Sequence, residues 1–75
     1  FGKPAALKRI IKKSGFEKSE MLAIGDEIRD IVAANKVEIP FGAVSWGFSS
    51  IEALQQHSPS HTFTEMHQIL EAVEA

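Results

Sequence analysis

The chain has no cysteine and no tyrosine, and only two of its 75 residues are aspartate. The missing thiols exclude disulfides, a thiolate metal site and cysteine-based catalysis. No apolar run approaches the roughly 20 residues needed to cross a bilayer, and no segment has the pattern of a signal peptide. We therefore expect a cytoplasmic protein that makes no contact with a membrane.

Composition indicates one small globular domain over residues 1–75, because 44% of the residues are apolar and 24% are charged. The charge is divided unevenly. Six basic against two acidic residues give residues 1–20 a net charge of +4, whereas two basic against eight acidic residues give the remainder −6. The basic residues alternate with apolar ones at helical spacing, with no aromatics between them to stack on bases. This pattern favours a solvated helix face over nucleic-acid binding.

Hydrophobic periodicity predicts helices that alternate with short strands. In chain order we expect helix 4–14, strand 21–24, helix 27–36, strand 41–45, helix 50–56, edge strand 61–63 and a terminal amphipathic helix from residue 66. Ser49 and Glu52 fit the S-x-x-E capping box and are expected to begin the third helix. The apolar run at 21–24 is typical of a strand buried on both faces. The alternation predicts an α/β fold with three α-β-α layers, about three parallel strands and four helices.

The most informative stretch, Gly25 to Asp30, follows the first expected strand directly. It places Asp26 and Asp30 four residues apart where the strand turns into a helix, so both side chains can point at one site at the strand's carboxyl end. Carboxylate oxygens suit Mg²⁺ better than a soft metal. Acids in a first helical turn also complement the helix dipole, and this purely structural interpretation stays open on the residues alone.

Lys3 is the second candidate for a functional residue. It comes directly before Pro4, which suits a first helical position, so its ammonium group could lie beside a helix N-terminus where anions bind. A lysine near a chain end is more commonly a surface residue.

Taken together, Lys3-Pro4 and the Gly-Asp-x-x-x-Asp pattern of residues 25–30 resemble the third and fourth motifs of the haloacid-dehalogenase-like (HAD) hydrolases. The phosphoglycolate-phosphatase-like branch is the most similar, and segments 43–48 and 58–63 also resemble it. The resemblance covers nearly the whole chain. It implies the C-terminal half of a HAD-type Rossmannoid core and a Mg²⁺-dependent phosphomonoester phosphatase with an aspartyl-phosphate mechanism.

The resemblance also implies roles for individual residues. Lys3 would bind the transferring phosphoryl group. Asp26 would hold Mg²⁺, and Asp30 would hold a water of the metal or orient the lysine. Glu27 would add a further metal contact, and Gly25 would allow close backbone approach at the strand end.

The family's Asp-x-Asp motif, which holds the nucleophile and the general acid/base, has no match here, because both aspartates belong to the fourth motif. The chain begins with Phe1 rather than Met, so we expect a piece of a longer enzyme that acts on a small phosphorylated metabolite. The piece alone is expected to be inactive. By the same resemblance the missing part supplies a strand beside residues 21–24. We expect the open edge of that strand to pair with a partner or to form a dimer.

Two other interpretations remain. One is a non-catalytic α/β interaction module whose acids only cap a helix. The weaker one is a receiver-like phosphoacceptor, which is disfavoured because the lysine precedes the acid-bearing strand.

The remaining candidate residues give weaker evidence for a functional site. The three histidines, His57, His61 and His67, are expected to be solvated, because a proline interrupts any helix between the first two and no cysteine or aspartate joins them. Trp46 and Phe48 are expected to pack in the core or at an interface rather than to line a pocket. The serines lack a suitably placed base, which argues against a serine nucleophile.

Overall fold

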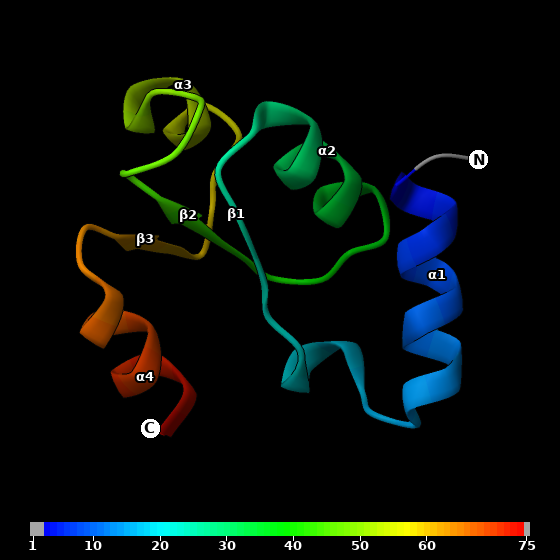
Figure 1. The fold of residues 1–75 in the computed structure, drawn as a ribbon. Coiled ribbons are helices and arrows are strands. Elements are labelled where there is room, and N and C mark those ends of the chain that lie inside the picture. The colour runs from blue at the N-terminus through cyan, green and yellow to red at the C-terminus, as the bar shows by residue number, and fades with distance from the viewer. Residues whose placement is uncertain (1–2, 75) are drawn as a thin grey trace.

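Four helices, one 3₁₀ helix and three strands make up the computed structural model, which describes residues 3–74, with side chains from residue 4 (Figure 1). In order they are α1 (Lys3–Ser14), η1 (Lys18–Glu20), β1 (Ala23–Gly25), α2 (Ile28–Lys36), β2 (Phe41–Val44), α3 (Ile51–Gln55), β3 (His61–Phe63) and α4 (Met66–Glu74). None of the helices within this range is long and apolar enough to span a membrane.

The three strands form one parallel sheet in the order β1-β2-β3. Ala23 lies opposite Phe41, and Gly42 lies opposite His61. All four residues of the central strand β2 are buried. The predicted α/β class, with three parallel strands and four helices, is confirmed.

One face of the sheet is covered by α1, α2 and α3 (Figure 1). Alternate residues of β2 point to this face, and the side chains of α2 and α3 that meet them repeat at helical spacing. The buried cluster consists of Ile31, Ala34, Val37, Ile39, Phe41, Ala43 and Leu54. From α1, Leu7 and Ile11 pack against its margin. This cluster is the main hydrophobic core.

The opposite face carries only α4 (Figure 1). Phe63 of β3 covers Gly42 there and is itself only 3% exposed. Nevertheless α4 has no buried residue, and its apolar side chains Met66 and Leu70 stay largely exposed. The helices on the first face therefore bury more apolar side chains than α4 does on the other face.

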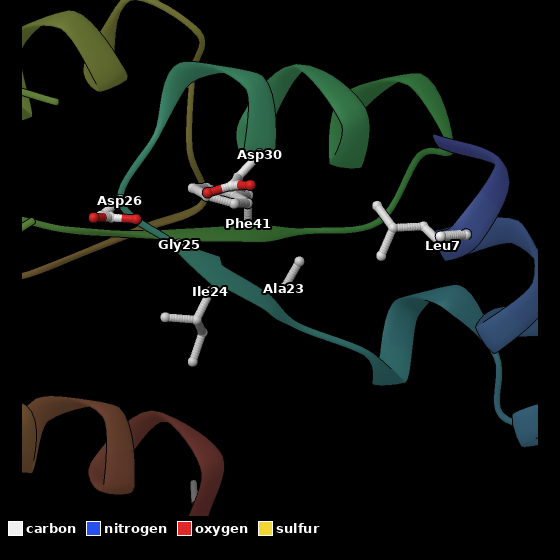
Figure 2. A pocket seen from close by; sticks show the side chains of 8 residues that line it. Leu7, Ala23, Ile24, Gly25, Asp26, Asp30 and Phe41 are labelled. Carbon is white, nitrogen blue, oxygen red and sulfur yellow. The ribbon is translucent and has the colours of Figure 1, made fainter. Parts of the chain in front are cut away.

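The first strand differs most from its prediction. It begins at Ala23, whose N–H donates to the Pro40 carbonyl at 2.9 Å, rather than at residue 21. Met21 instead donates to Lys18 at 3.1 Å and closes η1, a 3₁₀ turn that the periodicity did not predict. The expectation that this strand is buried on both faces is wrong, since Ile24 is 42% exposed. The physical reason is that the Ile24 side chain points away from Asp30 and Phe41, to the face of the sheet that carries only α4 (Figure 2).

The predicted cap of α3 is also wrong by one residue. The N-cap is Ser50, whose Oγ accepts the N–H of Ala53 at 3.2 Å. Ser49 uses its own N–H elsewhere, as a donor to the main-chain oxygen of Asp26 at 2.9 Å. The helix accordingly spans 51–55 instead of 50–56.

These two serines allow a matched test of the cap. Ser50→Ala should lower the free energy of unfolding by about 1 kcal/mol, because it leaves an N–H of the first helical turn without its acceptor. Ser49→Ala should cost much less, since the contact of Ser49 with Asp26 uses only the backbone. Urea unfolding of both variants measures the difference. A larger loss in Ser49→Ala would show that the cap has been assigned to the wrong residue.

Candidate functional site

A hollow of about 340 Å³ runs along β1 to its carboxyl end, between that strand and the helices α1 and α2 (Figure 2). Its lining residues are Ala6, Leu7, Ala23, Ile24, Gly25, Asp26, Asp30 and Phe41. The structure thus brings both predicted aspartates to one hollow. Carboxyl ends of parallel strands are where α/β proteins bind their ligands.

Asp26 occupies the turn between β1 and α2 and is tied to a distant loop. Its Oδ2 accepts the N–H of Phe48 at 2.8 Å, and its main-chain oxygen accepts the N–H of Ser49 at 2.9 Å. No hydrogen bond joins its other carboxylate oxygen, Oδ1, to the residues described. Asp26 therefore takes no part in the cap of α2.

Asp30 has a different environment, in the first turn of α2. Its Oδ2 accepts the N–H of Glu27 at 3.3 Å, which is the half of a capping box that an acid at the third helical position supplies. Figure 2 shows its side chain over Phe41. A Cβ on Gly25 would lie 2.8 Å from Oδ2 of Asp30, so the glycine leaves room for this carboxylate.

Glu27 is the N-cap residue of α2 and forms an ion pair with Arg29. The hydrogen bond and the charge of Glu27 raise the pKa of Arg29 above its ordinary value, with smaller contributions from Asp30 and Asp26. Glu27 borders a neighbouring hollow with Phe48 and is absent from the lining of the one beside β1. Its carboxylate is thus already engaged by a cation.

Lys3 is the first residue of α1, and its side chain lies outside the described residues, so its predicted role stays a prediction. Ala6 and Leu7, which follow three and four positions later, line the hollow. The N-terminal half of α1 therefore borders the site.

The loop after β2 contributes residues that sequence reasoning did not assign to the site. Gly47, Phe48 and Ser49 all contact or closely approach Asp26. Trp46 and Phe48 were expected in the core or at an interface; they are not core residues, since they are 47% and 84% exposed, and the interface alternative stays a prediction. One signal was available: neighbouring parallel strands end at the same edge, so the loops after β1 and β2 had to lie close together.

The histidines lie away from this hollow. His61 stacks on Phe63 with ring centroids 5.6 Å apart, and His67 is 3.6 Å from Glu71. Across the described part of the chain, no group of three or more His, Cys, Asp or Glu side chains could hold a metal ion. A cation at the hollow would consequently take one or two carboxylates from these residues, which is the usual protein contribution to a Mg²⁺ site.

Gly25→Ala tests the space left for Asp30. The added methyl group should push the carboxylate away from the Glu27 N–H and weaken the start of α2, at a cost of about 1 kcal/mol in the free energy of unfolding. Hydrogen exchange at the Glu27 amide should become faster. An unchanged exchange rate in a folded variant would contradict this account of Gly25.

A parallel α/β sheet with two aspartates at the carboxyl end of a strand defines a Rossmann-like α/β protein with an acidic site. Within that class, the chain belongs to the HAD-hydrolase-like family, whose model matches residues 1–71. The resemblance predicted from Lys3-Pro4 and residues 25–30 is therefore confirmed.

Two individual proteins are similar to this chain over most of its length. The chain is 31% identical over 71 residues to a phosphoglycolate phosphatase of Synechococcus elongatus, an alignment that covers 95% of this chain and 34% of that protein. A 1.7 Å crystal structure from Clostridium difficile, described as a candidate phosphatase, has the same fold, with a TM-score of 0.87 and 20% identity over 97% of this chain and 34% of that one. The chain thus spans about a third of the length of these relatives.

Proposed function

We propose that the chain supplies the metal-binding and phosphate-binding half of the active site of a Mg²⁺-dependent phosphatase that hydrolyses a small phosphomonoester. The observation that carries the proposal is the placement of Asp26 and Asp30 on one hollow at the carboxyl end of β1. Membership of the HAD-hydrolase-like family and similarity to a phosphoglycolate phosphatase support the reaction class. The cytoplasmic location expected from the sequence stays a prediction.

The residues present fit a Mg²⁺ ion. Asp26 would be the direct ligand through Oδ1, which makes no hydrogen bond within the described chain. Asp30 would act beside it through water or by orienting the lysine, while Glu27 is the weaker candidate because it pairs with Arg29. When bound, Mg²⁺ would neutralise charge that develops on the phosphoryl oxygens during transfer.

The other groups required follow from the family. Lys3 would hold the phosphoryl group as a point charge, and it precedes the hollow-lining Ala6 and Leu7 by the spacing of one helical face. The nucleophilic aspartate of an aspartyl-phosphate mechanism has no candidate among the 75 residues, since both aspartates serve the fourth motif. We therefore propose that these residues alone are inactive and that the nucleophile belongs to a longer parent protein.

One observation favours the rival proposal of a non-catalytic module. Asp30 does cap α2, as that interpretation expects. Asp26 is the residue that separates the two proposals, because its carboxylate lies at the hollow without contributing to the helix cap.

Mg²⁺ titration followed by NMR tests the metal site. Adding Mg²⁺ should shift the amide signals of residues 25–30 saturably, and Asp26→Asn should weaken binding at least about tenfold, because it removes the charge and leaves an oxygen for the Phe48 N–H. Glu52→Gln, the same change at an exposed acid of α3, is the control and should bind normally. No response of residues 25–30 at millimolar Mg²⁺ would support the non-catalytic module instead.

We further propose that β1 pairs along its free edge with a strand from outside these 75 residues. The strand is apolar and has a neighbour on one side only among the described strands, whereas β2 is paired on both sides. An apolar strand with unpaired backbone groups is a template for pairing with another chain. In the parent protein the partner would be a further strand of the sheet, and in the isolated chain it would be a second copy.

Ile24→Pro tests this edge without breaking the sheet. Ala23 donates its N–H to the carbonyl of Pro40, just before β2, so in a parallel ladder the N–H of the next residue, Ile24, faces the free edge. We expect Ile24→Pro to raise the dissociation constant of self-association about tenfold, and Ile24→Ala, which keeps the N–H, to change it less. Sedimentation of the 75-residue chain measures both. A strictly monomeric, cooperatively melting chain would contradict the proposed pairing.

A further inference from the structure

The loop of residues 45–49, between β2 and α3, approaches Asp26 too closely for any side chain at position 47. A Cβ on Gly47 would collide with the Cβ of Asp26 and would lie 2.5 Å from its Oδ2 and 2.6 Å from its Cγ. Nonbonded carbon atoms attract each other best at a separation of about 3.5–4.0 Å. The three atoms nearest to this position all belong to Asp26.

Asp26 cannot rotate out of such a collision. The colliding atom is its Cβ, which is fixed to the main chain and does not move when the carboxylate turns. That main chain directly follows β1, whose position is set by the hydrogen bond from Ala23 to Pro40 and by the pairing of Gly25 with Ala43. Relief would require a shift of the strand itself.

The loop is also held at both of its ends. Ser45 donates its N–H to the carbonyl of Phe63 at 2.9 Å, and Ser50 caps α3 through the N–H of Ala53 at 3.2 Å. In between, the N–H of Phe48 reaches Oδ2 of Asp26. A loop pinned at three points so close in sequence has little freedom to withdraw.

We propose that Gly47 is a positioning residue: its missing side chain lets loop 45–49 hold the carboxylate of Asp26 in one orientation. The N–H of Phe48 occupies Oδ2, which leaves Oδ1 as the oxygen presented to a cation. The inference rests on the proposed function only where it names Mg²⁺ as that cation. Partners that orient a metal ligand in this way commonly change metal affinity by about 10- to 100-fold when they are altered.

A stability cycle measured without Mg²⁺ tests the contact itself. Gly47→Ala should lower the melting temperature strongly in the unaltered protein. In an Asp26→Gly background, which lacks the colliding Cβ, the same change should cost less than half as much, because contacting residues couple in such a cycle. Gly15→Ala is the control: its Cβ would meet nothing within 4 Å, and its φ of +76° makes alanine costly for a reason unrelated to Asp26. Its cost should be equal in both backgrounds. Equal costs for Gly47→Ala would overturn the proposal.

A second pair of variants tests the orientation of the carboxylate even if Gly47→Ala does not fold. Phe48→Pro removes the N–H that binds Oδ2, whereas Phe48→Ala keeps it and removes only a side chain that is 84% exposed. With Mg²⁺ alone as the probe, NMR at the amides of Gly25 and Asp26 should show binding weakened about 10- to 100-fold in Phe48→Pro and nearly unchanged in Phe48→Ala. Equal binding by both variants would overturn the orienting role.

The two experiments separate the inference from the proposed function. Failure of the unaltered protein to bind Mg²⁺ would overturn the proposed function. The coupling between Gly47 and Asp26 in the Mg²⁺-free cycle would still decide whether the glycine positions this carboxylate.

Discussion

Burial of β2 beneath α2 and α3 is the interaction on which the rest of the structure depends. Phe41 and Ala43 face Ile31 and Leu54 across the main core, and β2 is the one described strand that is paired on both sides. Burying a large apolar side chain contributes roughly 1.5–3 kcal/mol, so a chain of this length depends on few such contacts. Both β1 and β3 pair with this strand, which therefore sets the register of each.

That register brings two turns together, because β1 and β2 end at the same edge of the sheet. The turn after β1 carries the carboxylates, and the loop after β2 packs against one of them. A glycine makes room at each place: Gly25 beside Asp30, and Gly47 beside Asp26. Neither has a positive φ, unlike Gly15, so these two glycines serve close approach rather than a left-handed turn.

Much of the fold was predictable from the sequence because its signals are local. The 3.6-residue period of α2 and α4 and the short apolar runs gave the correct order of elements and a parallel sheet. The 3₁₀ helix η1 was not predicted, because its three residues are too few to show a hydrophobic period. Ser49 matches the S-x-x-E capping pattern, but its N–H donates to the main-chain oxygen of Asp26. A pattern of neighbouring residues could not predict this contact, because Asp26 is distant in the sequence.

The candidate site was predictable to the same extent. Both Asp26 and Asp30 line one hollow, as predicted, although the helical spacing is not the reason, because Asp26 precedes the N-cap residue of α2. The contribution of loop 45–49 was not predicted, since Phe48 is 22 positions from the aspartate that it contacts. Trp46 and Phe48 were expected in the core or at an interface because they are aromatic, but both are exposed in the described chain and neither joins the core.

The two aspartates finally differ in what holds them, and this difference bears on function. Asp30 caps its own helix, as an acid at the third helical position commonly does. Nothing local requires Asp26. Its contacts come from a loop after another strand, and they need a glycine that leaves no space for a side chain. Asp26 thus ties the turn after β1 to the loop after β2, and it is the residue of this pair that the proposed function uses as the direct metal ligand.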